Sequence, residues 1–406
     1  MVPVVLQDFP IQNHVQVIKM NSNIVYLDNA ATTFPKPDGA LDRMVELYKE
    51  KGVSPGRGSY DLAFEAEDIV FNVRKRLARL FNTPNPERVV FTSNATDSLN
   101  IAIQGIVKKG DHVVTTKLEH NSVLRPLYHL REKNFAGYSL VDFDSSGFVD
   151  PDDISHAIKE STGLVIINHV SNVLGTVQPV KEIGEICSQK GVPLVIDAAQ
   201  SAGIIPIDME EMNISAVAFT GHKSLLGPTG TGGLAVSPSL EIKPVRFGGT
   251  GIDSESPAHN TTYPHRLEAG TVNMIGIIGL SEGIDYIENV GMKTIHQNEM
   301  ELFCKLRDGL SALESVEIYR ADNIKNHTAL LTVNVKGMDP GDAGSILDAD
   351  YNIAVRTGLH CAPHVHENLG TFPRGAVRFS IGPFNTDDHI DMAIEAMTAI
   401  DKYSRR

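Results

Sequence analysis

The sequence has few cysteines and no long apolar run. Only three of its 406 residues are cysteine, and no two of them stand at CxxC spacing. An odd and sparse set of cysteines does not build a disulfide framework, so we expect a reducing, cytoplasmic environment. No stretch approaches the roughly 18 apolar residues of a membrane span, and the first residues lack the basic and apolar regions of a secretory signal. We therefore expect no membrane partner.

The sequence also lacks an excess of basic residues. Its formal net charge is -14, with 36 lysines and arginines against 50 acidic residues. A protein that binds a phosphate backbone needs a basic surface to displace counterions, so we expect no nucleic-acid partner. The charge does not exclude an anionic small molecule, because such a ligand needs only a local pocket of hydrogen-bond donors.

The composition is otherwise ordinary for a globular protein, with 42% hydrophobic and 21% charged residues. A chain of this length is long enough for two domains. We expect an N-terminal extension at 1–23, a large domain at 24–275 and a smaller α+β domain at 276–406. We also expect the N-terminal segment to pack with the smaller domain.

From about residue 89, short β-branched runs alternate with segments of helical period. Strands that alternate with helices indicate crossover connections and a mostly parallel sheet, so the fold class is α/β. The expected strands are 88–92, 112–116, 164–170, 193–197 and 216–220, with helices at 93–107 and 180–189. In the smaller domain we expect helices at 277–290 and 294–312 and a strand at 330–335.

Two of the expected strands deliver chemically informative residues. Asp197 ends the apolar run PLVID, and Lys223 follows the next strand after Gly221-His222. Ligands of an open parallel sheet lie beyond the carboxyl ends of its strands, so we expect both side chains at one edge. An acid beside a desolvated lysine is what a pyridoxal 5'-phosphate (PLP) enzyme requires. Taken alone, an acid and a lysine at this spacing favour a structural ion pair at a sheet edge, and the flanking residues reverse that interpretation.

Those flanking residues resemble the class V aminotransferase family of PLP enzymes, most closely its group-II cysteine desulfurase and selenocysteine lyase branch. The resemblance implies PLP as cofactor and the PLP-dependent transferase fold type I, with a seven-stranded type of sheet in the large domain. The matching stretches, in family order, are YLDNAATTFPKP (26–37), SNATDSLN (93–100), EHNS (119–122), HVSNVLGT (169–176), DAAQ (197–200), TGHKSLLGPTGTGG (220–233), EAGTVN (268–273), RTGLHCAP (356–363) and VRFSIGPFNT (377–386).

The resemblance implies a role for each residue that contacts the cofactor ring. Lys223 carries the cofactor as an imine, and Asp197 holds the pyridine nitrogen protonated. Gln200 donates to the phenolic oxygen. His120 stacks on the ring and serves in proton transfer, and Asn172 contacts the ring oxygen or the substrate carboxylate.

The resemblance also implies residues for the phosphate and for assembly. Ala95 and Thr96, at the start of a helix, supply donors to the phosphate together with Thr220 and His222. Thr271 matches a residue that reaches the phosphate of the neighbouring subunit, which implies a homodimer with shared sites.

Other matched residues would act on the substrate, which the resemblance gives as L-cysteine or a related amino acid. Arg378 and Arg356 are expected to bind its carboxylate. Cys361 would be the thiolate that takes the substrate sulfur as a persulfide and leaves L-alanine, and nearby Arg356 and His360 would favour the thiolate. The short cysteine loop resembles that of group-II desulfurases, which implies sulfur transfer to an acceptor protein.

Leu359 stands where group-II members commonly carry a second histidine, and this departure keeps other functions open. They are a selenocysteine lyase or other C–S lyase, a class V aminotransferase with a bystander cysteine, and a non-catalytic scaffold of the same fold. The neighbours His360, Cys361, His364 and His366 do not have the spacing of a structural zinc module, so we expect no metal.

Overall fold

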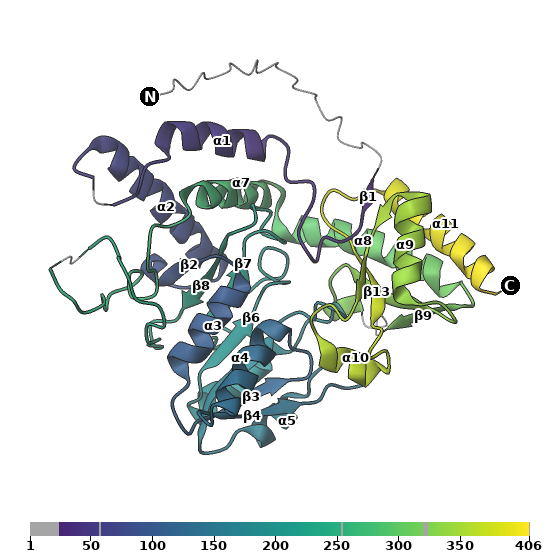
Figure 1. The fold of residues 1–406 in the computed structure, drawn as a ribbon, viewed down its shortest axis with the longest axis horizontal. Coiled ribbons are helices and arrows are strands. Elements are labelled where there is room, and N and C mark those ends of the chain that lie inside the picture. Colours follow the sequence, from purple (N-terminus) through teal and green to yellow (C-terminus); the bar gives the residue numbers. More distant parts are fainter. Residues whose placement is uncertain (1–23, 57, 253–254, 320–323, 406) are drawn as a thin grey trace, which may run out of the picture.

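A computed structural model describes residues 24–56, 58–252, 255–319 and 324–405. The expected extension at 1–23 lies outside the described residues. Figure 1 shows the large sheet with its helices in one part of the molecule and the C-terminal residues in another.

The large sheet has seven strands in the order β2-β8-β7-β6-β5-β3-β4. The central pairs from β7 to β4 are parallel, whereas β8 is antiparallel to both β7 and β2. The mostly parallel sheet predicted from the sequence is therefore confirmed. The strands are β2 (Val89–Thr92), β3 (His112–Thr116), β4 (Gly137–Val141), β5 (Thr162–Asn168), β6 (Leu194–Asp197), β7 (Ala216–Thr220) and β8 (Gly232–Val236).

Helices cover both faces of this sheet, because alternate residues of its strands are buried on opposite sides. Helices α2, α6 and α7 share a core with one face, and α3 and α4 share a core with the other. The helices of this part are α1 (Ala40–Lys51), α2 (Asp61–Leu80), α3 (Ala95–Ile106), α4 (Asn121–Glu132), α5 (Pro151–Ala157), α6 (Val180–Lys190) and α7 (Met274–Val290), with a 3₁₀ turn at Pro86–Arg88.

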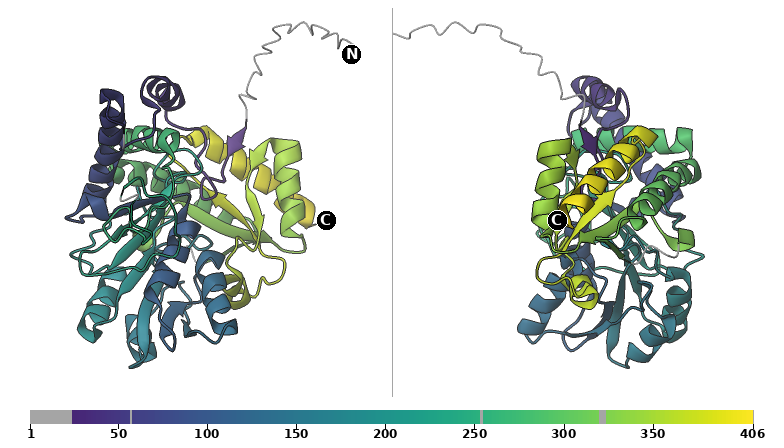
Figure 2. Two further views of the ribbon diagram at one scale, coloured as in Figure 1. Left: turned by 60° about the vertical axis from the view of Figure 1, so that its left-hand side comes forward. Right: turned by 90° about the vertical axis from the view of Figure 1, so that its right-hand side faces the viewer.

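The C-terminal residues build a second, antiparallel sheet in the order β12-β13-β10-β9. The N-terminal strand β1 pairs in parallel with β11, and Val25 and Leu27 are buried in the core of this part. Figure 2 shows these elements beside the large sheet. They are β1 (Val25–Tyr26), α8 (Met292–Ser311), β9 (Val316–Tyr319), a 3₁₀ turn (Ile324–Asn326), β10 (Leu330–Val335), α9 (Pro340–Tyr351), β11 (Ile353–Ala354), β12 (Arg356–Gly358), α10 (Pro363–Leu369), β13 (Ala376–Ser380) and α11 (Asp387–Ser404).

Helix α7 bears on where the large domain ends. Its residues Met274 and Ile277 belong to the core of the large sheet, and it packs on α1 and α2. We propose that the large domain extends through α7 and that the smaller domain begins at α8. The boundary expected at 275/276 would separate α7 from the core on which it packs.

Strand β8 was not predicted, because its sequence is part of a glycine-rich stretch. A Cβ on Gly232 would lie 2.6 Å from the backbone of Asn94, and one on Gly233 would lie 2.3 Å from the Phe219 ring. Only glycine fits there. The strand thus brings the start of α3 close to the end of β7, where the functional residues gather.

Candidate active site

Asp197 and Lys223 lie at the carboxyl edge of two neighbouring parallel strands. β6 ends at Asp197, which stands opposite Ala218 of β7. Lys223 follows the end of β7, so the sheet brings the two side chains to one edge, as predicted from their positions in the sequence. Burial lowers the pKa of the Lys223 amine to about 8, while the charge of Asp197 opposes that shift. Burial raises the pKa of Asp197, and Lys223 and the Ala199 amide oppose it.

A pocket with about 480 Å³ of empty space surrounds these two side chains. It brings together most of the residues that the sequence assigned to the cofactor. They are Ala95, Thr96, His120, Asn172, Asp197, Gln200, Thr220, His222 and Lys223, and the lining is completed by Asn94, Ser122, Asn168, Val170 and Ala199.

One end of the pocket is formed by the N-terminus of α3. The first amides of an α-helix have no acceptor within the helix, and Ala95 and Thr96 supply two of them. The side chain of the N-cap residue Asn94 accepts from the Asp97 amide instead. The Thr96 hydroxyl lies 2.7 Å from the Ser122 hydroxyl. This end therefore presents hydroxyls and free amides, which suit a phosphate.

His120 caps helix α4 at the pocket wall. Its Nδ1 accepts a hydrogen bond from the Ser122 amide at 3.0 Å and lies 2.7 Å from the Ser122 hydroxyl. Burial, reinforced by the positive charges of Lys223, Arg125 and Arg378, lowers the pKa of His120 to about 4. The ring is therefore neutral at neutral pH, with its proton on Nε2.

Three buried polar atoms in this pocket have no protein partner: Asn168 Oδ1, Asn172 Oδ1 and His222 Nδ1. Buried polar atoms are seldom left without a hydrogen bond, so they indicate a ligand with polar groups of its own. The Gln200 amide uses one N–H on the Ala30 carbonyl at 3.0 Å and has a second available. An amine, a facing carboxylate and a phosphate-binding helix end fit PLP.

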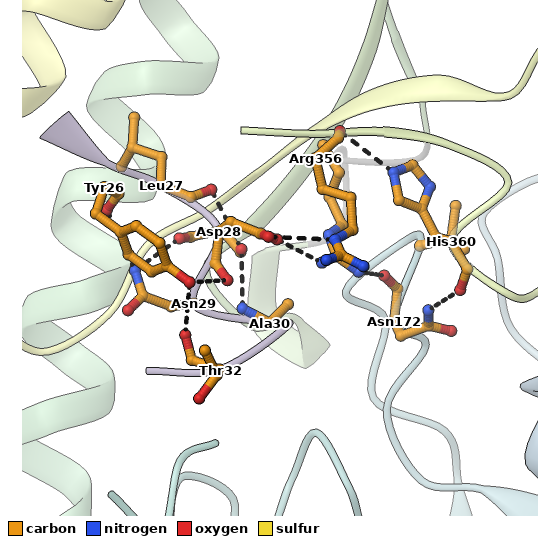
Figure 3. A network of polar contacts seen from close by, with 12 residues as sticks. Tyr26, Leu27, Asp28, Asn29, Ala30, Thr32, Asn172, Arg356 and His360 are labelled. Atoms are coloured by element: carbon orange, nitrogen blue, oxygen red, sulfur yellow. Dashed lines mark hydrogen bonds and ion pairs between the residues drawn. The ribbon is translucent and has the colours of Figure 1, made fainter. Parts of the chain in front are cut away.

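A charged cluster adjoins the pocket (Figure 3). Asp28 accepts from Arg378 Nη2 at 2.9 Å and from Arg356 Nε at 3.2 Å. Arg378 Nη1 donates to the Asn172 carbonyl at 2.9 Å, and its buried Nε–H has no partner. Arg378 is 2% exposed, so Asp28 is the counter-charge that allows it to stay buried. The free Nε–H leaves a donor for a substrate carboxylate.

Cys361 lies on an exposed loop that is bonded to the pocket through its backbone. The Asn172 side chain donates to the His360 carbonyl at 2.7 Å, and the Asn121 amide donates to the Cys361 carbonyl at 2.7 Å. Both His360 and Cys361 have positive φ angles, 49° and 58°. The backbone of the loop is therefore held next to Asn172, which lines the pocket, and next to the first residue of α4.

One sequence expectation for this loop is wrong. His360 was expected to favour the Cys361 thiolate, but burial and the charge of Arg378 lower its pKa well below the ordinary value. The ring is neutral and gives no positive charge to the thiol. The guanidinium of Arg356, the other expected source, is turned toward Asp28.

Thr271 does not lie in this pocket. Its side chain is exposed, and it lines two other hollows of the surface. That place is what a residue serving a neighbouring subunit requires, and the shared site stays a prediction.

Sequence reasoning gave no role to three residues that the structure places here. Asp28 lies in the stretch YLDNAATT, yet only the fold shows its two arginine partners. Ser122 links Thr96 to His120. Glu119 is fully buried, and burial raises the pKa of its carboxyl to about 8. Glu119 accepts from the Thr116 hydroxyl and from the backbone N–H of Asn168, and the second bond fixes Asn168 at the pocket wall.

The histidines near Cys361 differ in their burial and in their partners. His364 bonds to Glu367 at 2.7 Å on the outer side of α10, whereas His360 and His366 are buried. Among the described residues, no group of three or more His, Cys, Asp or Glu side chains is arranged to hold a metal ion. Nor does any described helix have the length and apolar character to cross a membrane.

Fold and site together define a pyridoxal-phosphate enzyme of fold type I. The family model Aminotransferase class-V matches residues 25–392, and the chain belongs to this family. A probable cysteine desulfurase of Methanothermobacter thermautotrophicus is 38% identical over 382 residues, with 93% of this chain and 94% of that protein covered.

Two solved structures are similar to this chain over most of its length. A cysteine desulfurase of Thermococcus onnurineus NA1 in its apo form superposes with a TM-score of 0.88 at 35% identity, over 94% of this chain and 95% of the other. A cysteine desulfurase of Escherichia coli has a TM-score of 0.83 at 25% identity, again over 94% and 95% of the two chains.

Proposed function

We propose that this chain is a cysteine desulfurase that converts L-cysteine to L-alanine and keeps the sulfur as a persulfide on Cys361. The observation that carries the proposal is the attachment of the Cys361 loop to the pocket through Asn172 and Asn121. A bystander cysteine would have no need of an exposed side chain on a loop whose backbone is bonded to Asn172 of the pocket. The names of the relatives support the same activity.

PLP, when bound, supplies an aldehyde for an amine and a protonated ring that withdraws electrons from the amino-acid substrate. Lys223 is the amine, and its lowered pKa makes it nucleophilic near neutral pH. Asp197 keeps a proton on the ring nitrogen. His120, neutral and protonated on Nε2, offers one ring face for stacking and a proton at a defined atom.

Arg378 and Asn172 would orient the substrate carboxylate. Arg378 retains a buried Nε–H without a partner, and Asn172 Nδ2 carries two N–H groups, so one is left to donate to a carboxylate. The other N–H of this amide donates to the His360 carbonyl. The same asparagine therefore joins the substrate site to the cysteine loop, and Arg356 borders the site from the exposed side.

In the sulfur step, the Cys361 thiolate attacks the sulfur of the substrate. An S–S bond forms, the C–S bond breaks, and its electron pair stays on the substrate carbon. That carbon takes one proton and becomes the methyl group of L-alanine, while Cys361 holds the persulfide. The two half-products contain all the atoms of cysteine and the thiol, so no oxidant is needed.

We further propose that the protein is a cytoplasmic homodimer in which Thr271 serves the neighbouring site. Its exposure and its place outside its own pocket support this assembly. The exposed Cys361 suits an acceptor protein that approaches closely to remove the sulfur.

The test is to incubate the purified, PLP-loaded protein with L-cysteine and to identify the amino-acid product by mass spectrometry. Alanine in a ratio of one to the sulfane sulfur supports the desulfurase. Pyruvate would instead identify an eliminating C–S lyase, and a keto acid with aminated cofactor would identify an aminotransferase. Parallel assays with L-selenocysteine separate a selenocysteine lyase from a desulfurase.

A further inference from the structure

A series of side-chain contacts begins at His360, the residue before Cys361. His360 Nδ1 lies 3.3 Å from His366 Nε2, and His366 Nδ1 lies 2.8 Å from the Thr371 hydroxyl. At the other end, His360 Nε2 lies 3.4 Å from the Arg356 carbonyl (Figure 3). The His366 side chain is fully buried on α10, and His360 is 7% exposed.

The group at one end of this series, the Arg356 carbonyl, determines which atom donates and which accepts in each hydrogen bond. A carbonyl only accepts, so His360 Nε2 carries the proton that reaches Arg356. Burial lowers the pKa of both histidines, that of His366 to about 4, so both rings are neutral. His360 Nδ1 must then accept from His366 Nε2–H. His366 Nδ1 must in turn accept from the Thr371 hydroxyl.

These hydrogen bonds hold a strained part of the backbone. Left-handed conformations are unfavourable for a residue with a side chain, and His360 and Cys361 adopt them consecutively. Such a pair persists only where its surroundings hold it. Asn172 and the backbone N–H of Asn121 bond to the two carbonyls, and the contact with His366 holds the His360 ring.

We propose that His366 is a positioning residue for Cys361, acting through the ring of His360. With both ring nitrogens of His360 occupied, that ring serves neither as base nor as acid for the thiol. Its contribution is to keep the Cys361 backbone in the conformation that presents the thiol to the substrate. The role of His366 in catalysis rests on the proposed desulfurase function. The hydrogen bonds between His360, His366 and Thr371 do not depend on that function.

The first experiment reads the chain directly and needs no substrate. In protein labelled with ¹⁵N-histidine, both His360 and His366 should appear as neutral Nε2–H tautomers between pH 6 and pH 8. Assignment comes from the single variants His360→Gln and His366→Gln. A cationic His360, or one protonated on Nδ1, would overturn the proposal.

The second experiment uses matched variants and hydrogen exchange of the same protein. His366→Leu removes the donor to His360, whereas His366→Gln keeps an N–H at a similar distance. Thr371→Val and Thr371→Ser form a second pair, for the case in which His366→Leu does not fold. His364→Leu, on the same helix but bonded to Glu367, is the control.

We expect His366→Leu and Thr371→Val to speed exchange of the Asn121 and Ala362 amides by about tenfold, because the loop opens more often. The backbone amide of Asn121 is informative because it lies on α4 and its acceptor is the Cys361 carbonyl. Its exchange therefore reports on the position of the Cys361 backbone. His366→Gln, Thr371→Ser and His364→Leu should exchange like the wild type. Unchanged exchange in both disruptive variants, or equal acceleration in His364→Leu, would overturn the proposal.

Kinetics then connect the chain to the reaction. In His366→Leu we expect kcat for alanine formation to fall by about tenfold or more, because a small misplacement of a reacting group is costly. KM and the spectral change on adding L-cysteine should stay near wild type, and His366→Gln should recover most of kcat. If the wild type makes no alanine, the proposed desulfurase function is wrong. The histidine tautomers and the amide exchange rates still test the hydrogen bonds between His360, His366 and Thr371. A wild-type kcat in His366→Leu would refute the positioning role.

Discussion

Arg356 and Arg378 stand directly opposite each other on the antiparallel strands β12 and β13. Two like charges across a strand pair repel each other. Here the carboxylate of Asp28 lies between them and accepts from both. The arginines differ in burial, since Arg378 is 2% exposed and Arg356 is exposed. The cost of losing each contact should differ accordingly.

The first prediction concerns this cluster. Asp28→Ala leaves the buried Arg378 without its counter-charge and should destabilise the protein by about 3–5 kcal/mol. Arg356→Gln removes only the exposed pair and should cost about 0–1 kcal/mol. Urea denaturation of the PLP-free protein measures both, with Asp28→Asn as an intermediate case. Equal losses in Asp28→Ala and Arg356→Gln would show that Asp28 does not compensate the buried charge.

The second prediction concerns Lys223 and pH. Only the uncharged amine attacks the cofactor aldehyde, and the pKa of Lys223 is lowered to about 8. The rate at which PLP-free protein takes up PLP should therefore rise about tenfold from pH 7 to pH 9 and then level off. Borohydride reduction and peptide mapping should place the label on Lys223. A rate that keeps rising beyond pH 10 would indicate an unperturbed lysine.

Asp197 and Lys36 give the controls for that profile. Asp197 raises the pKa of Lys223, so Asp197→Asn should move the midpoint to lower pH. Lys36 also has a pKa lowered to about 8, by burial, and its amine donates to the His222 carbonyl. The label must be absent from Lys36, and Lys36→Met should keep the midpoint near pH 8.

The third prediction separates cofactor chemistry from sulfur removal. Cys361→Ala leaves Lys223, Asp197 and Arg378 in place, so it should bind PLP and show the spectral change on adding L-cysteine. It should lose alanine and persulfide formation by at least about a hundredfold, because the nucleophile is gone. With L-selenocysteine we expect a smaller loss, since selenium leaves more easily.

The buried Cys187 is the matched control for that experiment. Burial raises the pKa of its thiol to about 12, so it is not a nucleophile at neutral pH. Cys187→Ala should keep the rate of alanine formation. Undiminished alanine formation in Cys361→Ala would contradict the assignment of the persulfide.

The fourth prediction tests the shared site. Thr271→Ala should weaken PLP retention, and Lys223→Ala should abolish catalysis. If Thr271 serves the partner subunit, mixing the two variants creates dimers with one intact site and one doubly altered site. At a PLP concentration at which Thr271→Ala alone is inactive, random exchange of subunits should then restore activity to about a quarter of the wild type, because half of the dimers are mixed and each has one intact site of two. Absence of recovery after proven exchange, or a fully active monomer, would contradict sharing.

The regular core was predictable because its signals are local. Strands at 112–116, 216–220 and 330–335 match β3, β7 and β10, since each is a short run of β-branched and apolar residues between polar segments. The strand expected at 164–170 forms two residues earlier, as β5. The position of Asp197 and Lys223 at strand ends followed from the same alternation.

The remaining parts depend on contacts between distant segments. Asp28 gave no signal of its own, because its partners are more than 300 residues away. His366 stands six residues from His360, but only the turn that precedes α10 brings the rings together. The order of β8 and β2 in the sheet was likewise not readable, because glycine in a strand is selected by close packing and not by β-propensity.

The pairing of β1 with β11 also constrains when the protein is assembled. Proteins are made from the N-terminus, and domains fold as their last residues emerge. Val25 and Leu27 find their core only among residues that follow α7, and the Asp28 backbone bridges to Ser380 near the end of the chain. Until those residues are made, Val25 and Leu27 lack the core in which they are buried in the folded protein. The cluster of Asp28, Arg356 and Arg378 can therefore form only after β13 has been synthesised.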